Sequence, residues 1–138
     1  MAGYSQRSLP DKLGIRRGTR VIAIGAPRSY RSALGELPQG ASLHARLSAS
    51  GCFIHCFVRR RSELANKFPR LARALSDDGM LWISWPKKSA RLDSDLTENV
   101  VREIGLTLGL VDVKVCAVDE VWSGLKFVRR VSNRGDRT

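Results

Sequence analysis

The feature that most constrains the fold is an alternation of short apolar runs with stretches of helical periodicity. The run CFIHCFV, Cys52–Val58, is apolar almost throughout, and a second such run, MLWISW, spans Met80–Trp85. Between the two runs, apolar residues recur at helical spacing from Leu64 to Leu75. Apolar runs of this type are typical of strands buried on both faces, as in parallel sheets. The pattern therefore predicts a strand–helix–strand unit in the centre of the chain.

The same periodicities extend to both sides of this unit. Further strands are expected at residues 20–24, 41–47, 111–118 and 125–130, and short helices at 10–13 and 28–37. Ser62 is expected to cap the central helix, and Pro69 predicts a kink or a division into two short helices. Asp77–Gly79 predicts a turn. Asp95 with Glu98 predicts the start of the last helix.

Strands and helices therefore alternate, and the last two strands are expected to form an antiparallel hairpin. This order predicts an α/β fold, a three-layer Rossmann-like sandwich whose mostly parallel sheet ends in that hairpin. We expect an N-terminal arm with a short helix at residues 1–18 and a single α/β domain at 19–131. Residues 132–138 are expected to form a basic, disordered tail.

The charge balance is strongly basic. The chain has 24 Lys and Arg against 13 Asp and Glu, a formal net charge of +11 and an isoelectric point of about 10.6. Such a surface attracts anions generally, so an anionic small molecule, an acidic protein and nucleic acid are all candidate partners. Nucleic acid has the least support of the three, because aromatic residues make up only 7% of the chain and no known binding module is present.

The compartment is inferred from what the sequence lacks and from its cysteines. No apolar stretch is long enough to span a membrane, and the basic first twenty residues do not resemble a signal peptide. The cysteine count is odd, and Cys52 and Cys56 lie in an apolar run. Buried reduced thiols and a cytoplasmic location, away from membranes, are therefore expected.

A ligand site is expected at one particular edge of the sheet. In open α/β sheets, ligands bind outside the carboxyl ends of the parallel strands. The residues that follow the first and fourth strands, and the connection before the last strand, are expected at that edge. An anion pocket with an aromatic wall is predicted there, formed by Gly25, Arg28, Arg31, Trp85, Lys87, Lys88, Asp119 and Trp122. The alternative is that the two tryptophans cap the core and the lysines are solvated.

Metal binding and nucleophilic catalysis have little support. On an extended strand Cys52 and Cys56 would lie about 13 Å apart, too far to share a zinc ion. His55 would point to the opposite face of that strand. His44 and His55 both lie within expected strands, where a satisfied structural histidine is the better interpretation. No catalytic residue and no metal site are therefore predicted.

Two family resemblances follow from these segments. RRGTRVIAIGAP, LARALSDDGMLWISWPKK and the closing hairpin resemble class I S-adenosylmethionine (SAM)-dependent methyltransferases, of which this chain would be a reduced form. LPDKLGIRRG, FVRRR, DGMLWISWPKK, DLTENVVRE and GLVDVKVCAVDEVWSGLKFVRR resemble a bacterial family named domain of unknown function 3052. The second resemblance covers nearly the whole chain and implies a small bacterial cytoplasmic protein. It implies no activity.

The methyltransferase resemblance also implies features that the chain lacks. A cofactor loop typically has spaced glycines, whereas the loop here, Gly25–Arg28, has one glycine and loses a backbone donor at Pro27. No carboxylate follows the second expected strand at Leu47–Ser50, and Arg59–Arg61 stand where an acidic or Asn/Asp-Pro-Pro element often lies. A strand and a helix of the usual fold are also missing. SAM binding is therefore judged unlikely, and no cofactor is expected.

The main interpretation is a non-catalytic binding or regulatory domain with a basic ligand or partner site at the strand-end edge. One alternative is a divergent SAM-dependent enzyme, which would have to bind its cofactor despite the loop at Gly25. A second alternative is a protein that binds nucleic acid non-specifically, with an affinity that falls steeply with salt.

Overall fold

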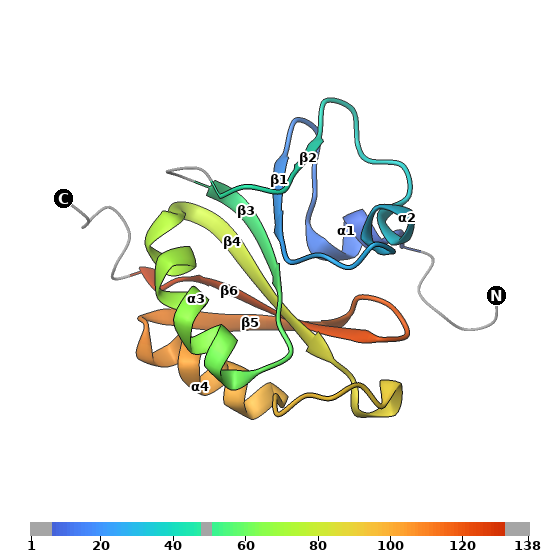
Figure 1. Ribbon diagram of the computed structural model, residues 1–138. Coiled ribbons are helices and arrows are strands. Elements are labelled where there is room, and N and C mark those ends of the chain that lie inside the picture. Colours follow the sequence, from blue (N-terminus) through green and yellow to red (C-terminus); the bar gives the residue numbers. More distant parts are fainter. Residues whose placement is uncertain (1–6, 48–50, 132–138) are drawn as a thin grey trace.

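The computed structural model describes residues 7–47 and 51–131, in which six strands form one sheet of order β2-β1-β3-β4-β6-β5 (Figure 1). The strands are β1 (Arg20–Ile24), β2 (Ser42–His44), β3 (Gly51–Phe57), β4 (Leu75–Pro86), β5 (Leu110–Ala117) and β6 (Trp122–Arg129). The helices are α1 (Leu9–Leu13), α2 (Tyr30–Leu34), α3 (Arg61–Ala74) and α4 (Glu98–Thr107), with a 3₁₀ turn η1 (Lys88–Ala90). β1 to β4 are parallel, whereas β6 is antiparallel to both β4 and β5. The predicted Rossmann-like α/β fold with a closing hairpin is confirmed.

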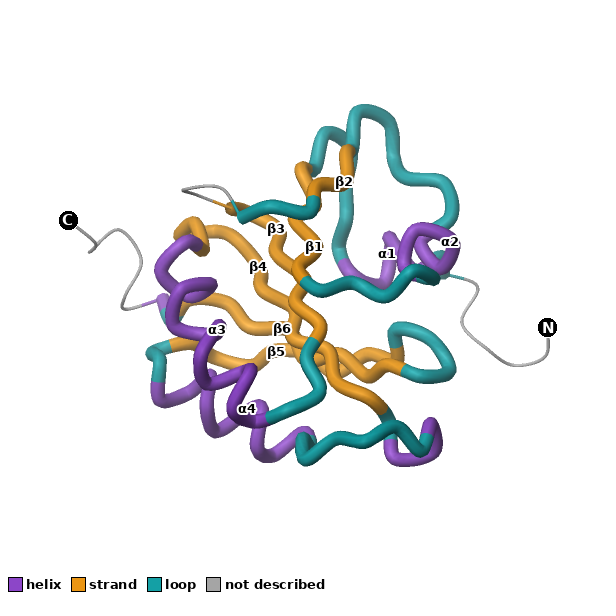
Figure 2. Tube along the Cα trace, viewed as in Figure 1, coloured by secondary structure: helices purple, strands orange, loops and turns teal. Residues whose placement is uncertain are grey.

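Helices cover both faces of the sheet. Figures 1 and 2 show α3 and α4 together on one side and α1 and α2 on the other. On the first side, Phe68 of α3 and Val101 of α4 belong to the same buried cluster as Ile54 of β3. On the second side, Leu13 of α1 and Tyr30 of α2 belong to a cluster with residues of β1, β3, β4, β5 and β6. Beyond their first residues, Cys52 and Met80, the apolar runs are buried on both faces, as the sequence predicted.

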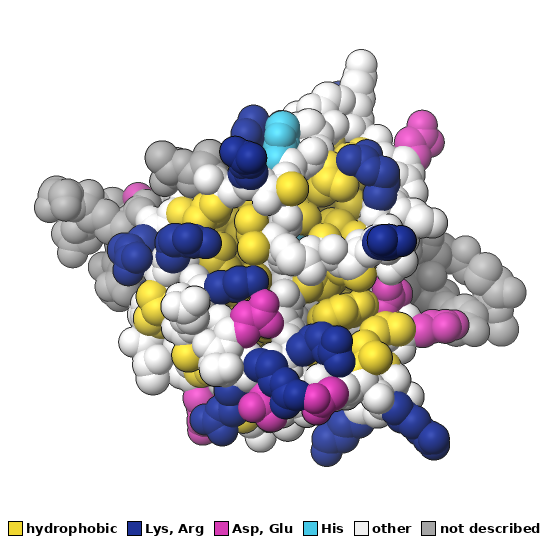
Figure 3. Space-filling model, in the orientation of Figure 1, with side chains coloured by type: hydrophobic (Ala, Val, Ile, Leu, Met, Phe, Trp, Pro, Cys, Tyr) yellow, Lys and Arg dark blue, Asp and Glu magenta, His cyan; other side chains and the backbone are white. Residues whose placement is uncertain are grey.

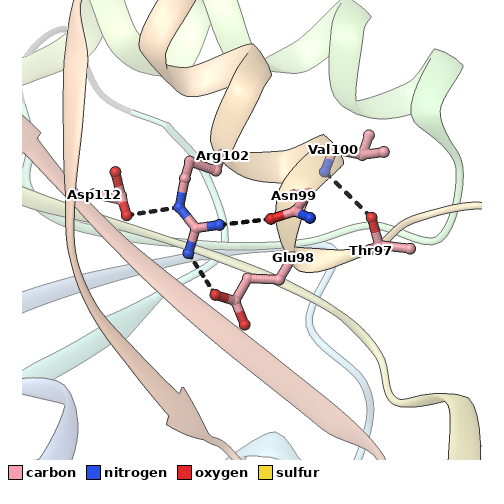
Figure 4. A network of polar contacts seen from close by, with 6 residues as sticks. All are labelled: Thr97, Glu98, Asn99, Val100, Arg102 and Asp112. Atoms are coloured by element: carbon pink, nitrogen blue, oxygen red, sulfur yellow. Dashed lines mark hydrogen bonds and ion pairs between the residues drawn. The ribbon is translucent and has the colours of Figure 1, made fainter.

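Helix α4 lies very close to the hairpin because its inward face carries a glycine. A Cβ atom on Gly105 would lie 2.2 Å from Cε1 of Phe127 on β6. Around this contact, Figure 4 shows Arg102 of α4 donating to Asp112 of β5, with Nε 2.8 Å from Oδ2. Arg102 also bonds Glu98 and Asn99 of its own helix. These polar contacts add to the apolar packing that holds α4 over the hairpin.

Helix α3 continues through its proline. Pro69 lies inside the single helix Arg61–Ala74, so the predicted division into two short helices is wrong. Phe68 and Leu71, on either side of the proline, are 0% and 1% exposed. Because tertiary packing supplies most helix stability, burial of both neighbours maintains the helix despite one lost hydrogen bond.

The start of α3 is capped from a distant part of the chain. The backbone N–H of Arg61 donates to Oδ1 of Asp95 over 2.7 Å, whereas the N-cap residue Arg60 makes no side-chain cap bond. The prediction that Ser62 caps this helix is therefore wrong. The carboxylate of Asp95 lies at the positive end of the helix dipole, where an anion is favoured.

Asp95 was expected to start the last helix, and that prediction is also wrong. α4 begins at Glu98, and the hydroxyl of the N-cap residue Thr97 accepts from the N–H of Val100 over 3.2 Å. Thr97 provides the same capping chemistry two residues later in the chain. Asp95 is thereby free to cap α3.

The turn predicted at Asp77–Gly79 is instead an irregular part of β4. Gly51 of β3 pairs with Leu75, and Phe53 pairs with Met80, so β4 uses five residues where β3 uses two. The surplus residues form a bulge within the ladder. The turn-forming residues therefore distort the strand without ending it.

The two edges of the sheet differ. β2 has three residues, fewer than the seven expected, and pairs only with β1. β5 has eight residues and pairs with β6, with a register shift between Asp112 and Lys114.

No helix in the described part of the chain is long and apolar enough to cross a membrane. The tail predicted at residues 132–138 lies outside the described residues.

Candidate functional site

A hollow of about 380 Å³ lies at the carboxyl ends of β1 and β2. Its volume falls within the range of small-molecule pockets, near the lower end. The loop that follows β1 forms one wall, α2 forms another, and the end of β2 completes it. The lining residues are Ala23, Gly25, Ala26, Pro27, Arg28, Tyr30, Arg31, Leu43, His44 and Ala45.

This hollow lies where the chain connections diverge. β1 pairs with β2 on one side and with β3 on the other, so the connections diverge between β1 and β3, next to Gly25 of the hollow. Such a switch point leaves a crevice outside the strand ends, which is the usual ligand position in open α/β sheets. The predicted edge is thus the edge that carries the hollow.

Gly25 is required at this point for two reasons. Its φ angle is +69°, a conformation that side chains disfavour. A Cβ atom there would also lie 2.9 Å from the carbonyl oxygen of Phe57, which ends the neighbouring strand β3. The glycine therefore lets the loop after β1 turn tightly against β3 and leaves the mouth of the hollow open.

A buried hydrogen-bond chain lies behind the hollow. The hydroxyl of Tyr30 lies 2.7 Å from Nδ1 of His55, and Nε2 of His55 lies 2.7 Å from Oγ of Ser84. The three side chains are at most 2% exposed and come from α2, β3 and β4. Burial lowers the pKa of His55 to about 3 and raises the pKa of Tyr30 above its usual value. His55 is therefore neutral and bonded at both ring nitrogens, which agrees with the structural role predicted for it.

An aromatic row continues from this chain along the same edge. The ring of Phe57 stacks on His55 with 4.2 Å between centroids and meets Tyr30 edge-on at 5.0 Å. Trp122, at the start of β6, meets Phe57 edge-on at 5.2 Å. The row forms a buried aromatic layer, and of its members Tyr30 also lines the hollow.

The charged lining of the hollow is entirely cationic. Arg28 and Arg31 are exposed guanidinium groups, and no carboxylate is among the lining residues. In Figure 3, Lys and Arg side chains border the apolar surface in this part of the molecule. His44 completes the polar groups, with its Nε2 2.7 Å from the hydroxyl of Ser42. A ligand with both an anionic group and hydroxyls matches these donors.

The remaining predicted site residues lie outside the hollow. Trp85 is buried in the cluster on the α3 and α4 side, and Trp122 is buried on the opposite side. Both tryptophans therefore fit the alternative interpretation of the predicted pocket, in which they cap the core. Lys87 and Lys88 line a separate hollow of about 320 Å³ between the end of β4 and the start of α4. Asp119 accepts from the N–H groups of Val121 and Trp122, so its carboxylate shapes the β5–β6 turn.

The basic run Arg59–Arg61 is bonded to the segment that precedes α4. Arg60 pairs with the carboxylate of Asp93, and Nε of Arg59 donates to the carbonyl of the same residue. The carboxylates of Asp93 and Asp95, the second of which lies at the start of α3, offset the positive charge of this run. The run therefore joins α3 to the segment that precedes α4.

The cysteines are only partly as predicted. Cys56 and Cys116 are buried, and burial raises the pKa of the Cys56 thiol to about 12. Cys52, however, is exposed, and the prediction that it is buried is wrong. It lies near the start of β3, next to the irregular part of β4.

Sequence reasoning missed the two residues that, besides Arg28 and Arg31, bring polar side chains to the hollow. Tyr30 lies in a short helix of mixed composition, and His44 was interpreted only as a strand histidine. The expected second strand, 41–47, placed His44 in its middle, whereas the observed β2 ends at His44. A polar side chain that ends a strand at a switch point faces any ligand bound there.

Comparisons with solved structures agree with this architecture. A SAM-dependent methyltransferase from Aquifex aeolicus is 16% identical with a TM-score of 0.56, and the match covers 85% of each chain. A TehB-like SAM-dependent methyltransferase from Corynebacterium glutamicum is 12% identical with a TM-score of 0.52, covering 94% of this chain and 91% of that one. Magnesium protoporphyrin IX methyltransferase from Synechocystis PCC 6803 with bound SAM is 13% identical with a TM-score of 0.55, covering 88% and 74%. In the form of that enzyme bound to S-adenosylhomocysteine (SAH), the match covers 56% of the neighbour's chain.

The chain therefore has a methyltransferase-like, Rossmann-like α/β fold. No protein-family model matches it, and no curated protein matches it. At these identities the likeness establishes the fold, while activity is a separate question.

Two expectations are corrected by these comparisons. The main interpretation, a non-catalytic binding or regulatory domain, is contradicted because the structural neighbours are SAM-dependent methyltransferases. The expectation that SAM is unlikely is contradicted because a neighbour of this fold was crystallised with SAM. Both expectations rested on the single glycine and the proline of the loop after β1, on the missing carboxylate, on the basic run Arg59–Arg61, and on the missing strand and helix. Of these features, the structure describes Gly25 as the residue that lets the loop turn tightly against β3.

Proposed function

We propose that the chain is a divergent SAM-dependent methyltransferase that binds SAM in the hollow at the carboxyl ends of β1 and β2. The observation that carries the proposal is the position of the hollow. It opens beside Gly25 at the switch point of a methyltransferase-like sheet, and its volume is about 380 Å³. A bound SAM would supply an activated methyl group to a nucleophilic acceptor.

The lining residues fit most groups of this cofactor. Arg28 and Arg31 provide guanidinium donors for the carboxylate of the methionine part. Gly25 leaves room for close approach to the backbone of the loop. His44 at the end of β2 provides a ring nitrogen for the ribose hydroxyls, in the place where a carboxylate is usual.

The chain's own residues also prepare the site. The bonds among Tyr30, His55 and Ser84 hold α2 against β3 and β4, which fixes one wall of the hollow.

The absence of a carboxylate in the lining has an electrostatic consequence. SAM carries a positive sulfonium centre, whereas SAH lacks that charge. Two arginines and no acidic group therefore disfavour SAM relative to SAH. The hollow is expected to bind SAH several-fold more tightly than SAM, and the difference should shrink as salt rises.

The test is isothermal titration with SAM and SAH. Saturable binding in the micromolar range is expected, weakened by about tenfold or more in an Arg28→Gln, Arg31→Gln double variant. The matched control is Arg20→Gln with Arg70→Gln, which removes the same charge from exposed positions outside the hollow. Absence of SAH binding to the wild-type protein, or equal weakening in both double variants, would contradict the proposal.

Family and compartment are proposed on separate grounds. The resemblance to domain of unknown function 3052 rests on the quoted segments. A cytoplasmic location is supported by three cysteines that form no disulfide in the described part of the chain. An acidic partner and nucleic acid stay predictions.

A further inference from the structure

A second hollow, of about 390 Å³, lies at the opposite edge of the sheet from the proposed cofactor site. It opens at the amino ends of β1, β3 and β4, on the face that α1 covers. Its lining residues are Gly14, Arg16, Thr19, Cys52, Phe53, Asp78, Met80 and Lys126. None of these residues lines the hollow beside Gly25.

Three cations gather at this second hollow. Lys126 of β6 pairs directly across the ladder with Lys114 of β5, and like charges in such positions repel each other. Burial lowers the pKa of Lys126, and the charges of Lys114 and Arg16 lower it further. The fold therefore tolerates an unfavourable concentration of positive charge at one place.

Only one of the three cations has a structural explanation. Nζ of Lys114 donates to the carbonyl of Lys12, at the end of α1, over 3.0 Å. Among the described residues, the side chains of Arg16 and Lys126 form no ion pair. Asp78 lines the hollow but is exposed and forms no ion pair with either of them. Two unneutralised cations thus face the hollow.

The other walls of the hollow are apolar or weakly polar. Phe53 is 1% exposed and Met80 is half-buried, and they lie beside the cations at the base of the hollow. The hydroxyl of Thr19, which accepts from the N–H of Arg16, adds one polar group. The volume exceeds that of an inorganic oxyanion, so a ligand that fills it has an apolar body as well as a charged head.

We propose that this second hollow is a binding site for a small organic phosphate, with its oxyanion at Arg16 and Lys126 and its apolar body against Met80 and Phe53. An arginine fork and an ammonium group together match the geometry and charge of a phosphate. The limited volume favours a small molecule over a nucleic-acid strand, which needs an extended basic track with stacking aromatic residues.

The first measurement is isothermal titration with phenyl phosphate, with inorganic phosphate as the comparison. Saturable binding of phenyl phosphate is expected, and it should be tighter than that of inorganic phosphate. Arg16→Gln should lower the affinity about tenfold or more. Arg17→Gln is the matched control because it removes the same charge one residue away, where the guanidinium bonds Gln39 instead.

Lys126→Met provides a second variant. It removes one member of a repelling pair, so it should fold at least as stably as the wild-type protein and should bind phenyl phosphate about tenfold or more weakly. Equal effects of Arg16→Gln and Arg17→Gln, or no saturable binding of phenyl phosphate to the wild-type protein, would overturn the proposal.

Cys52 supplies a readout at the site itself. Its exposed thiol lines this hollow, so bound phenyl phosphate should slow its alkylation by iodoacetamide in the wild-type protein and not in Arg16→Gln. Unchanged alkylation at saturating phenyl phosphate would exclude the site.

Tight binding of a single-stranded oligonucleotide, weakened equally by Arg16→Gln and Arg17→Gln, would favour a general basic surface and overturn the proposal. SAH titrations of the same variants should be unchanged, which separates this site from the proposed cofactor site.

Discussion

The hydroxyl of Tyr30 and Nδ1 of His55 lie 2.7 Å apart in a region with almost no access to solvent. This bond joins α2, which forms a wall of the proposed cofactor site, to β3 in the middle of the sheet. Ser84 extends the connection to β4. The position of the wall therefore depends on a polar chain inside an otherwise apolar layer, and buried polar chains are costly when they are incomplete.

Tyr30→Phe tests that dependence. Removal of the hydroxyl leaves a buried ring nitrogen without a partner, so the free energy of unfolding should fall by about 1–3 kcal/mol. Urea denaturation measures the change. Ser42→Ala is the matched control because it removes a hydroxyl from the other histidine, at an exposed position, and should change stability by about 0.5 kcal/mol or less. Similar effects of both variants would contradict the role assigned to Tyr30.

The buried His55 predicts a dependence of stability on acid pH. Its pKa is about 3 in the folded protein against an ordinary 6.5, so below pH 6.5 the unfolded chain takes up a proton that the folded protein does not. Stability should therefore fall as the pH decreases from 6.5 towards 3, by at most about 1.4 kcal/mol per pH unit from this group. Urea midpoints measured through this range give the slope.

A comparison of two variants isolates the contribution of His55. The pKa values of Glu63 and Asp112 are lowered in the folded protein, so these carboxyls add to the acid slope at still lower pH. His55→Gln should flatten the upper part of the slope, whereas His44→Gln should leave it as in the wild-type protein. An unchanged slope in His55→Gln would show that this histidine becomes charged inside the fold.

The three cysteines should differ in reactivity. Cys52 is exposed, whereas Cys56 and Cys116 are buried and the pKa of Cys56 is raised to about 12. A thiol-reactive disulfide reagent should titrate one group quickly in the folded protein and all three in denaturant. Cys52→Ser should abolish the fast phase. A second fast-reacting group would indicate local opening of β3 or β5.

Gly105→Ala should destabilise the protein even though alanine is the better helix former. The added methyl group would overlap with the ring of Phe127, and overpacking of this kind costs about 1–3 kcal/mol. Glu103→Ala, at an exposed position of the same helix, should have little effect or a slight stabilising one. Thermal unfolding compares the two variants. Partial recovery of stability in a Gly105→Ala, Phe127→Leu double variant would confirm that the ring is the obstacle.

Much of the fold was predictable because the signals are local. The run Cys52–Val58 is apolar on both faces, and such a run has few alternatives to a central parallel strand. The edge that carries the candidate site followed from the order of strands and helices alone. The helix starts were predicted less well, because Asp95 caps α3 from more than thirty residues away in the sequence. A capping pattern in sequence does not show which helix receives the bond.

The site itself was only partly predictable. Gly25, Arg28 and Arg31 follow the first strand and lie in the hollow as expected. Trp85 and Trp122 share the same edge in sequence order, but their side chains point into the two cores on opposite sides of the sheet. Whether a residue at a strand end faces solvent or core depends on strand alternation and on the helices packed there. Composition does not contain that information.

The register shift in β5 has a consequence for how the molecule behaves among copies of itself. A sheet with two open edges can recruit further strands, and the exposed side chains of Val113 and Val115 would favour such growth. The irregularity between Asp112 and Lys114 interrupts the row of backbone donors and acceptors that a new strand would need, and the charge of Lys114 opposes a like edge. At the other edge, a strand of three residues offers too short a template. Both features oppose the addition of a strand from another copy at the edges of this sheet.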